Sequence, residues 1–242
     1  MTPKKDQKTK NLRYRKKERT KQNILTAAEK LFSKRSFEEV SLEEIAESAF
    51  VSRTTLYNYF QNKDAIYFEI GRQMFETTND RIEQNYPNDI PGIDQFLQLA
   101  KSAFISGVEK GIIFDIMREF FKRVQLHNVT IKKWYDIIDA GTEKKEFKKL
   151  LKNFEEPYLI ELYVQLKRNT DLWMKVIRKG KSDGTIRKDL DDVHIAQFVY
   201  MLMSGMADEV KLRSAVLDRI GFTQEEITEH IMNLIEAFLK GK

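Results

Sequence analysis

The chain has 242 residues and no cysteine, so it can form one large or two smaller domains, and disulfide or thiolate chemistry is excluded. Residues 1–21 carry ten Lys or Arg against two acids, a net charge of +8, whereas the whole chain carries +5, so residues 22–242 sum to −3. A basic terminal segment favours a polyanionic partner, either nucleic acid or an anionic membrane, although a solvated tail has the same composition.

We expect neither a signal peptide nor a membrane span. Residues 1–21 have no apolar core, and the longest uncharged run, residues 193–207, has 15 residues where a spanning helix needs about 20. We therefore expect a soluble, cytoplasmic protein without a membrane partner. Only four prolines and ten glycines occur, and apolar residues recur at spacings of three and four, which predicts an all-α fold.

The first predicted helices follow the basic segment. Residues 21–34 place their apolar side chains on one stripe and are predicted to form a helix. Ser41 begins the next helix, because Glu44 stands three residues later at the spacing of a capping box. Ser52 begins a second short helix over residues 53–59, after a turn of about three residues.

The later helices are separated by turns and by one lysine-rich segment. A long helix is predicted from Lys63 past residue 74, up to a break over residues 87–92. Further helices are expected over residues 91–108, 112–124, 157–178, 191–206 and 223–239, where prolines suit first turns and Asp191 and Thr223 suit caps. Residues 130–153 show no clear periodicity, and Asp183-Gly184 marks the clearest loop.

Residues 41–60 have the layout of a helix-turn-helix, in which two capped helices meet at a steep angle. Leu56 and Phe60 are expected to anchor the second helix in the core, and Val51 the turn. Where this layout reads DNA, the second helix enters the major groove and its polar residues meet base edges. An ordinary helical hairpin with a polar face is the alternative.

The run VSRTTLYNYFQNKDAI over residues 51–66 sharpens this pattern. Together with the preceding ILTAAEKLFSKRSFEEVSLEEIAESAF, it resembles the N-terminal domain of the tetracycline-repressor (TetR) family of bacterial transcriptional regulators. The resemblance covers residues 18–70, and DGTIRKDLDD before an apolar helix adds to it. It implies a basic flexible arm (1–17), a DNA-binding domain (18–70) and a regulatory domain for effector binding and dimerisation (71–242).

The resemblance also implies roles for single residues of the second helix. By position, Arg53, Thr54 and Thr55 would meet base edges, and Tyr57 and Lys63 would hold phosphates. Tyr59 would lie along the groove wall and Ser41 near a phosphate, where the helix dipole favours an anion. The predicted DNA-binding set is Ser41, Ser52, Arg53, Thr54, Thr55, Tyr57, Asn58, Tyr59 and Lys63.

The sequence departs from the family pattern at the turn and at the first helix of the motif. Phe50 and Ser36 stand where the family usually has glycine, and a positive φ at Phe50 would cost about 1–2 kcal/mol. We expect Phe50 to tilt the second helix or to pack on the rim of the domain. Glu43 and Glu44 would repel phosphate, so the basic arm is expected to supply backbone or minor-groove contacts instead.

The resemblance implies a homodimer formed by the last two long helices, with two reading helices about one DNA turn apart. Residues 193–206 are apolar on nearly all faces and the last helix has a wide apolar stripe, which suits a four-helix interface. Burial inside a monomer would give the same pattern. The predicted interface is Phe198, Leu202, Met206, Ile231, Leu234 and Phe238.

An effector pocket is expected among the central helices. It should be mostly apolar with few polar anchors, which points to a hydrophobic effector. The candidates are Phe96, Phe104, Phe114, Met117, Phe121, Trp134, Tyr158, Tyr163 and Trp173. Plain core packing is the alternative for aromatic and methionine residues of this kind.

The sequence offers little for enzyme chemistry. Its three histidines are isolated and no glycine-rich phosphate loop occurs, so we expect no catalytic residue, metal or cofactor. The predicted function is a transcriptional regulator of the bacterial nucleoid that binds a palindromic double-stranded DNA operator. Repression relieved by a small, hydrophobic effector is the favoured mode. An activator of the same family, or a helical protein that binds polyanions through its basic arm, is the alternative.

Overall fold

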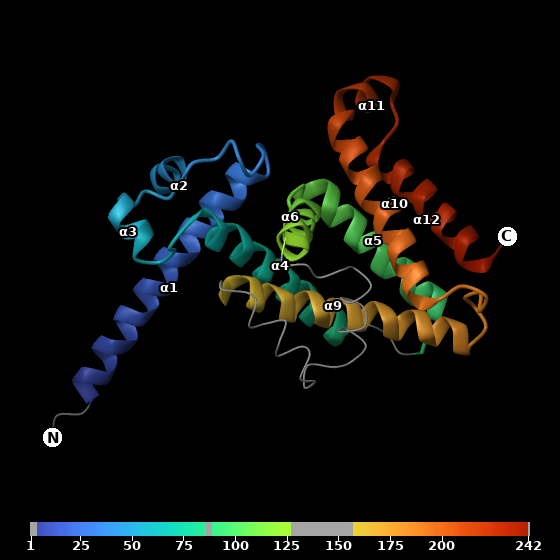
Figure 1. Cartoon of the computed structure of the whole chain (residues 1–242), viewed down its shortest axis with the longest axis horizontal. Helices are drawn as coiled ribbons and strands as arrows, with labels where there is room; N and C mark the ends of the chain where they lie inside the picture. Colours follow the sequence, from blue (N-terminus) through green and yellow to red (C-terminus); the bar gives the residue numbers. More distant parts are fainter. Residues whose placement is uncertain (1–3, 86–88, 127–156, 242) are drawn as a thin grey trace. The chain divides into compact units, whose positions relative to one another are not determined.

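The computed structural model describes residues 4–85, 89–126 and 157–241, and Figure 1 shows their helices. None of these residues forms a strand, which confirms the predicted all-α fold. The chain divides into two compact units, residues 1–70 and residues 71–242.

Unit 1 is a small cluster of helices at the N-terminal end of the chain. It contains α1 (Lys4–Phe32), α2 (Leu42–Ser48), α3 (Arg53–Tyr57) and the first turns of α4 (Lys63–Asn85). Helix α4 continues past residue 70, so it contributes residues to both units. The two short helices α2 and α3 give the helix-turn-helix that the sequence predicted.

Helix α1 begins at Lys4, well before the predicted start near residue 21. Residues 4–17 are therefore helical, which corrects the expectation of a flexible arm. After Pro3 no proline or glycine occurs before Gly71, and Lys, Arg and Gln are good helix formers. A helix that is nucleated where residues 24–32 pack can propagate backwards through such a sequence, and in Figure 1 α1 extends beyond α2 and α3.

Buried side chains of α1, α2 and α4 form the core of unit 1. Ile24 and Ala28 of α1, Ile45 of α2 and Ile66 of α4 are each 0% exposed. The ring of Phe32 meets Tyr67 edge-on with centroids 4.9 Å apart, which joins the end of α1 to α4. This packing fixes the frame on which α3 is held.

Unit 2 contains the remaining helices of the described chain. They are α5 (Gly92–Lys110), α6 (Ile113–Leu126), α9 (Pro157–Ser182), α10 (Asp192–Leu212), α11 (Ser214–Ile220) and α12 (Gln224–Lys240). All except α11 were predicted. Helix α11 has no buried residue, and Val216 and Ile220 are 59% and 67% exposed, so it carries no apolar stripe facing a core. The predicted caps at Asp191 and Thr223 are confirmed.

Helix α5 lies at the centre of unit 2 and packs against α9, α10 and α12. Its residues Phe96, Ala100 and Phe104 follow one another at a spacing of four and are each 0% exposed. They form the core face of the helix. A second face, at Leu99 and Ser106, borders a cavity that is described below.

The N-terminus of α5 is capped by a loop that lies 91 residues later in the chain. The amide of Gly92 donates to the Asp183 carboxylate (2.7 Å), and the amide of Ile93 donates to the Thr185 hydroxyl (3.1 Å). A Cβ atom at Gly92 would lie 2.2 Å from the amide nitrogen of Gly180, so only glycine permits this approach. The loop predicted around Asp183-Gly184 thus supplies the cap that Pro91 cannot.

Two further points bear on the sequence predictions. The lysine-rich segment over residues 130–153, which includes Trp134, lies outside the described residues. Among the helices that are described, none is long and apolar enough to cross a membrane.

Candidate nucleic-acid interface and ligand cavity

The turn between α2 and α3 is a Schellman motif with phenylalanine at its left-handed position. The amide of Val51 donates to the Ala46 carbonyl (2.9 Å), and the amide of Phe50 donates to the Glu47 carbonyl (3.0 Å). Phe50 has φ 54° and is 96% exposed. The expectation that it packs on the rim of the domain is therefore wrong within the described chain, since the strained backbone turns its ring outward.

Helix α3 is held by its apolar residues and leaves its polar residues outside. Leu56 and Phe60 are 1% and 5% exposed, which confirms them as the anchors of the helix. Arg53, Thr54 and Tyr57 are exposed on the opposite side, and Tyr57 is 52% exposed. The five-residue helix therefore presents arginine, hydroxyl and phenol groups to a partner.

Arg53 is paired with an acidic residue of the neighbouring helix. Its Nη2 forms an ion pair with Oε1 of Glu43, and the two side chains are 65% and 46% exposed. Exposed pairs of this kind contribute about 0–1 kcal/mol, so a DNA base or phosphate can displace Glu43. In the free chain, Glu43 holds the Arg53 side chain back towards α2.

Two of the predicted contact residues are engaged in helix caps. The Ser52 hydroxyl accepts from the Thr55 amide (3.0 Å) and lies 2.8 Å from the Thr55 hydroxyl. Ser41 donates its hydroxyl and its amide to the Glu44 carboxylate, each at 2.9 Å. Ser41 then has no donor left for a phosphate, which contradicts the role predicted for it. Its position as a cap is confirmed.

The capping bonds also fix the charge of Glu44. Its carboxylate accepts from the Ser41 amide, from Arg35 (2.8 Å) and from the Ser41 hydroxyl. These bonds, the first most strongly, lower the pKa of Glu44 from 4.5 to about 2. Glu44 is therefore ionised at neutral pH, and Arg35 pairs with its charge.

Lys63 binds the protein itself rather than facing solvent. Its Nζ donates to the carbonyls of Phe37 (2.6 Å) and Val40 (2.8 Å), and lies 3.4 Å from the Glu38 carbonyl. It also lies 4.3 Å from the centre of the Phe37 ring. This corrects the predicted phosphate contact, because the ammonium group closes the turn between α1 and α2.

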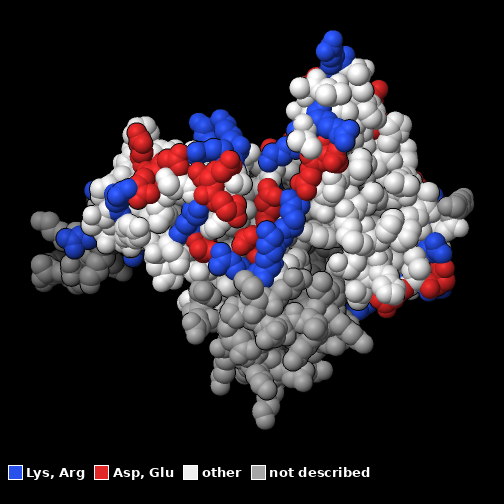
Figure 2. Space-filling model, turned by 45° about the horizontal axis from the view of Figure 1, so that its top comes forward, with Lys and Arg blue, Asp and Glu red and all other residues white. Residues whose placement is uncertain are grey.

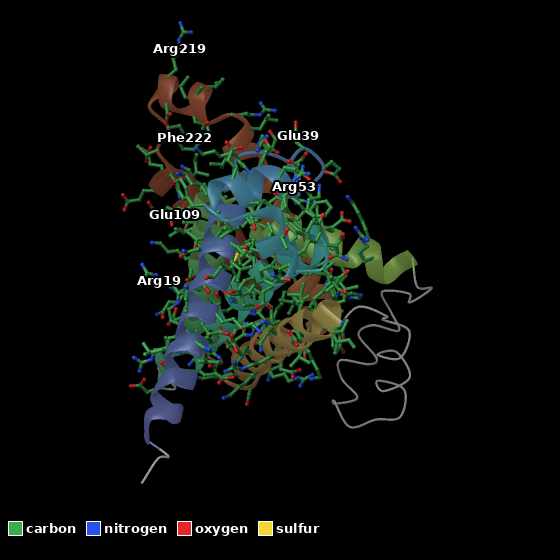
Figure 3. All side chains as sticks on the ribbon, turned by 90° about the vertical axis from the view of Figure 1, so that its left-hand side faces the viewer. Arg19, Glu39, Arg53, Glu109, Arg219 and Phe222 are labelled. Atoms are coloured by element: carbon green, nitrogen blue, oxygen red, sulfur yellow. The ribbon has the colours of Figure 1, made fainter. Side chains whose placement is uncertain are left out.

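The remaining predicted contacts differ in exposure. Asn58 forms the C-cap of α3 through its backbone amide, and its side chain is exposed. Tyr59 is half-buried beside it. Arg19 projects from the side of α1 in Figure 3, and Arg13, Arg15, Lys16 and Lys17 are exposed with it. Residues 13–19 of the basic segment therefore expose these cations along the helix.

Unit 2 encloses a cavity of about 420 Å³ between α4, α5, α6, α9 and α10. Of the predicted pocket residues, four line it: Phe114, Met117, Phe121 and Trp173. Phe96, Phe104, Tyr158 and Tyr163 do not. Phe96, Phe104 and Tyr163 are each 0% exposed, so core packing was the correct reading for them.

The cavity is more polar than the sequence suggested. Polar residues among its lining are Thr78, Arg81, Gln98, Ser102, Ser106, Asn169, Thr170, Gln197 and Tyr200. Apart from Tyr200 these residues are not aromatic, so a prediction based on aromatic and methionine residues did not include them. Spacing carries some signal, because Leu99, Ser102, Ala103 and Ser106 recur at three and four on the second face of α5.

An apolar surface runs along α10 and α12. Phe198, Met201 and Leu234 are 39%, 60% and 54% exposed, and Phe198 stacks on Phe238 with ring centroids 4.2 Å apart. In Figure 2 the surface over these helices shows few charged side chains. The predicted interface residues Leu202, Met206 and Phe238 are half-buried, whereas Ile231 is only 4% exposed. Ile231 therefore belongs to the core of unit 2 and not to an interface.

Comparison with known proteins places unit 1. Residues 24–70 match the family described as "Bacterial regulatory proteins, tetR family". This range runs from the packed half of α1 to the first turns of α4. Unit 1 thus contains a tetR-family domain.

Curated relatives match this chain over stretches of different length. The HTH-type transcriptional regulator RutR of Escherichia coli is 45% identical over 56 residues, which are 23% of this chain and 26% of RutR. The HTH-type transcriptional repressor KstR2 of Rhodococcus jostii is 24% identical over 69% of this chain and 68% of its own length. The chain spans about half the length (53%) of a Haemophilus influenzae regulator that it also matches.

Solved structures share the fold of the whole chain. FadR of Bacillus subtilis, in complex with stearoyl-CoA, aligns with a TM-score of 0.60 at 12% identity, over 91% of this chain and 98% of its own. The MbdR regulator of Azoarcus sp. CIB aligns with a TM-score of 0.59 at 18% identity, over 92% and 98%. At these identities the likeness establishes the fold alone and nothing about ligands.

Proposed function

We propose that this chain is a homodimeric, sequence-specific DNA-binding regulator of transcription in the bacterial nucleoid. The supporting observation is the exposed group Arg53, Thr54 and Tyr57 on a helix whose other side is anchored by Leu56 and Phe60. A helix of this kind presents base-reading groups to the major groove while its backbone is held by the core. Asn58 and Tyr59 extend the same surface.

The apolar surface on α10 and α12 supports the dimer. Phe198, Met201 and Leu234 are large apolar side chains left exposed in the described chain, and a built Cβ at Gly205 would meet nothing within 4 Å. An exposed group of large apolar side chains is typical of an interface, and the open space at Gly205 allows a second helix to approach closely. Two copies related by a two-fold axis would read the two halves of a palindromic operator.

The cavity supports regulation by a small molecule. Its volume of about 420 Å³ suits a ligand of drug size. Thr78 and Ile82 of α4 line it, and the same helix begins at Lys63 in unit 1. A ligand that binds more tightly to one position of α4 would shift the population towards that conformation. DNA affinity would then fall or rise, depending on which conformation binds DNA.

Repression is the favoured mode, since KstR2, a relative that matches 69% of this chain, is named a transcriptional repressor. Activation by the same dimer would differ only in where the operator lies relative to the promoter. A reporter placed behind the operator, with and without the gene for this chain, separates the two.

The proposal is tested by selecting DNA from a random pool with the full chain and measuring affinity at several salt concentrations. We expect one palindromic sequence to be enriched, with binding at least a thousandfold tighter than to random DNA, about the lower limit for specific proteins. Equal affinity for all DNA, or for anionic vesicles alone, would support the polyanion-binding alternative and refute the regulator.

Two variants separate base reading from general attraction. Arg53→Ala should cost about 1–3 kcal/mol of operator binding and relax the preference at one base position. Glu43→Gln should tighten binding to all DNA, because it frees Arg53 and removes a negative charge beside the phosphates. An Arg53→Ala variant that keeps the full operator preference would count against this reading helix.

A further inference from the structure

One wall of the cavity carries a chain of three amide groups. Asn79 of α4 is 0% exposed, and its Nδ2 donates to the backbone carbonyl of Gln165 (3.0 Å). Asn169 lies one turn further along α9, and its Nδ2 donates to Oδ1 of Asn79 (2.8 Å). Asn169 itself lines the cavity, whereas Asn79 and Gln165 lie behind it.

The backbone carbonyl at the start of this chain fixes the orientation of both asparagine side chains. A carbonyl oxygen can only accept, so the atom of Asn79 that faces Gln165 must be its NH₂ group. The Oδ1 of Asn79 then faces Asn169, which must in turn offer its own NH₂ group. The remaining polar atom of Asn169, its Oδ1, takes no hydrogen bond from any residue that the structure describes. The cavity wall therefore presents a fixed acceptor.

The charge of the cavity lining is low. Arg81 is the single charged residue among the described residues that line it, and its side chain is exposed and donates to the Ser102 hydroxyl (3.1 Å). The rest of the lining is apolar or carries neutral polar groups. Taking an ionised ligand group out of water into such surroundings is costly. The described lining offers a cation no opposite charge, and it offers an anion only the exposed Arg81, which already bonds Ser102.

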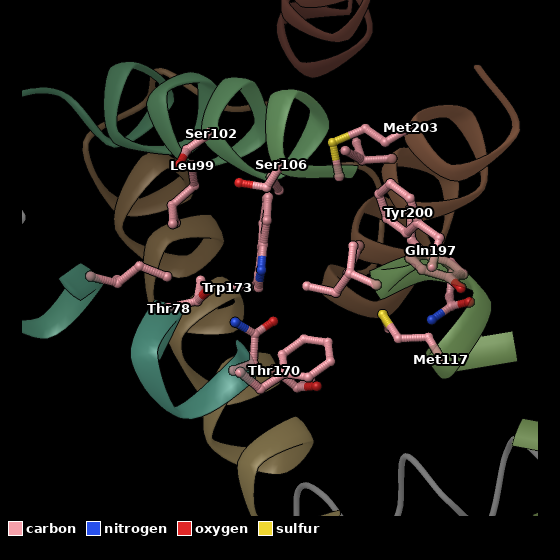
Figure 4. A pocket seen from close by; sticks show the side chains of 18 of the residues that line it. Thr78, Leu99, Ser102, Ser106, Met117, Thr170, Trp173, Gln197, Tyr200 and Met203 are labelled. Carbon is pink, nitrogen blue, oxygen red and sulfur yellow. The ribbon is translucent and has the colours of Figure 1, made fainter. Parts of the chain in front are cut away.

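A flat apolar surface stands next to the acceptor. Trp173 follows Asn169 by four residues on α9, so both side chains lie on the same face of the helix. Phe96 meets the Trp173 ring edge-on with centroids 5.1 Å apart and holds it in place. Figure 4 shows Trp173 standing between Leu99 and Ser102 on one side and Met117 and Tyr200 on the other.

We infer that the cavity binds an uncharged aromatic molecule that carries a hydroxyl or N–H group, with its ring against Trp173 and its donor on Asn169 Oδ1. The inference rests on the proposed function in so far as this molecule is the effector. A ligand with only acceptors would leave Oδ1 of Asn169 buried without a partner. A cation would lose its hydration without gaining a counter-charge, and an anion would have to compete with Ser102 for the exposed Arg81. The expected effector is thus a hydrophobic molecule that also carries a hydrogen-bond donor.

The experiment uses three small probes of one shape: 2-naphthol, 2-methoxynaphthalene and 2-naphthoate. The first offers a hydroxyl donor, the second has an acceptor only, and the third is an anion. Binding to the full chain is measured by calorimetry, and by quenching of Trp173 fluorescence in a Trp134→Phe variant, which leaves Trp173 as the single tryptophan. We expect 2-naphthol to bind about tenfold more tightly than either of the others, as one neutral hydrogen bond allows.

Variants then locate the acceptor. In Asn169→Leu the preference for 2-naphthol over 2-methoxynaphthalene should disappear, whereas Gln98→Leu, which removes an amide elsewhere in the lining, should keep it. The comparison of probes on the unaltered chain stands even if Asn169→Leu fails to fold. Tightest binding of 2-naphthoate, equal binding of all three, or binding of none overturns the inference. Operator binding is measured without probes, so a failure of the proposed function is seen separately.

Discussion

Helices α2 and α5 begin in different ways, and the difference separates the two units of this protein. Helix α2 is capped by the residue before it, since Ser41 and Glu44 exchange bonds across three residues. Helix α5 has no side-chain cap of its own, and its first amides are bonded by Asp183 and Thr185, which lie 91 and 92 residues later. A local cap forms with its helix, whereas a distant cap forms only when the whole unit has folded.

The difference between the local cap of α2 and the distant cap of α5 bears on how a ligand can act. The motif that faces DNA carries its own capping signals, so its geometry depends little on the state of unit 2. The start of α5 depends on the loop between α9 and α10, and α5 forms part of the cavity wall. A ligand that stabilises the cavity should therefore stabilise this loop as well.

Lys63→Met tests whether unit 1 also depends on contacts between residues far apart in the sequence. The ammonium group of Lys63 joins α4 to carbonyls 23 and 26 residues earlier, and losing these bonds leaves the carbonyls of Phe37 and Val40 without their donor. We expect the free energy of unfolding of unit 1 to fall by about 1–3 kcal/mol in chemical denaturation. Lys34→Met, at an exposed position, is the control. Unchanged stability together with a weaker salt dependence of DNA binding would restore the phosphate role of Lys63.

Asp183→Ala tests the distant cap. Removing a cap of this kind costs about 1 kcal/mol, and here the loss should appear in unit 2 alone. In thermal unfolding, the midpoint of unit 2 should fall and the midpoint of unit 1 should stay unchanged. The affinity of the cavity for 2-naphthol should fall together with the stability of unit 2. Asp189→Ala serves as the matched control, because Asp189 lies in the same loop but bonds Arg187 and, within the described chain, no amide of α5. Equal effects of both substitutions would contradict the cap.

Phe50→Gly should raise stability. Phe50 holds the left-handed position of the turn at φ 54° with its ring exposed, so glycine removes the strain and loses little packing. We expect unit 1 to gain about 1 kcal/mol in free energy of unfolding. Phe50→Asn should give an intermediate gain, because asparagine tolerates this conformation better than phenylalanine. A loss of stability in Phe50→Gly would show that the ring is packed after all.

Glu44→Gln tests the pH dependence of the local cap. The pKa of Glu44 is lowered to about 2 from 4.5, so its contribution is fully present above pH 4.5 and is lost as the pH falls towards 2. The backbone amide signal of Ser41 should follow this loss in an NMR titration. In Glu44→Gln the change between pH 4.5 and 2 should vanish from that signal. A midpoint near 4.5 in the unaltered chain would mean that the carboxylate is not bonded in solution.

The sequence alone determined the features that depend on neighbouring residues. The caps at Ser41, Ser52, Asp191 and Thr223 are each made with a residue two or three positions later, and all are present. The anchors Leu56 and Phe60 followed from helical spacing in the same way. Local geometry links such pairs whatever the rest of the chain does.

Only the tertiary structure decided which faces meet. Phe96 and Phe104 were as good candidates for the cavity as Phe114 and Trp173, but the face of α5 that holds them turns to the core. The bonds of Lys63 and the amide chain from Gln165 to Asn169 join residues 23 to 90 positions apart. Spacing within one helix shows that a residue is on a face, and only the packing of other helices shows what that face touches.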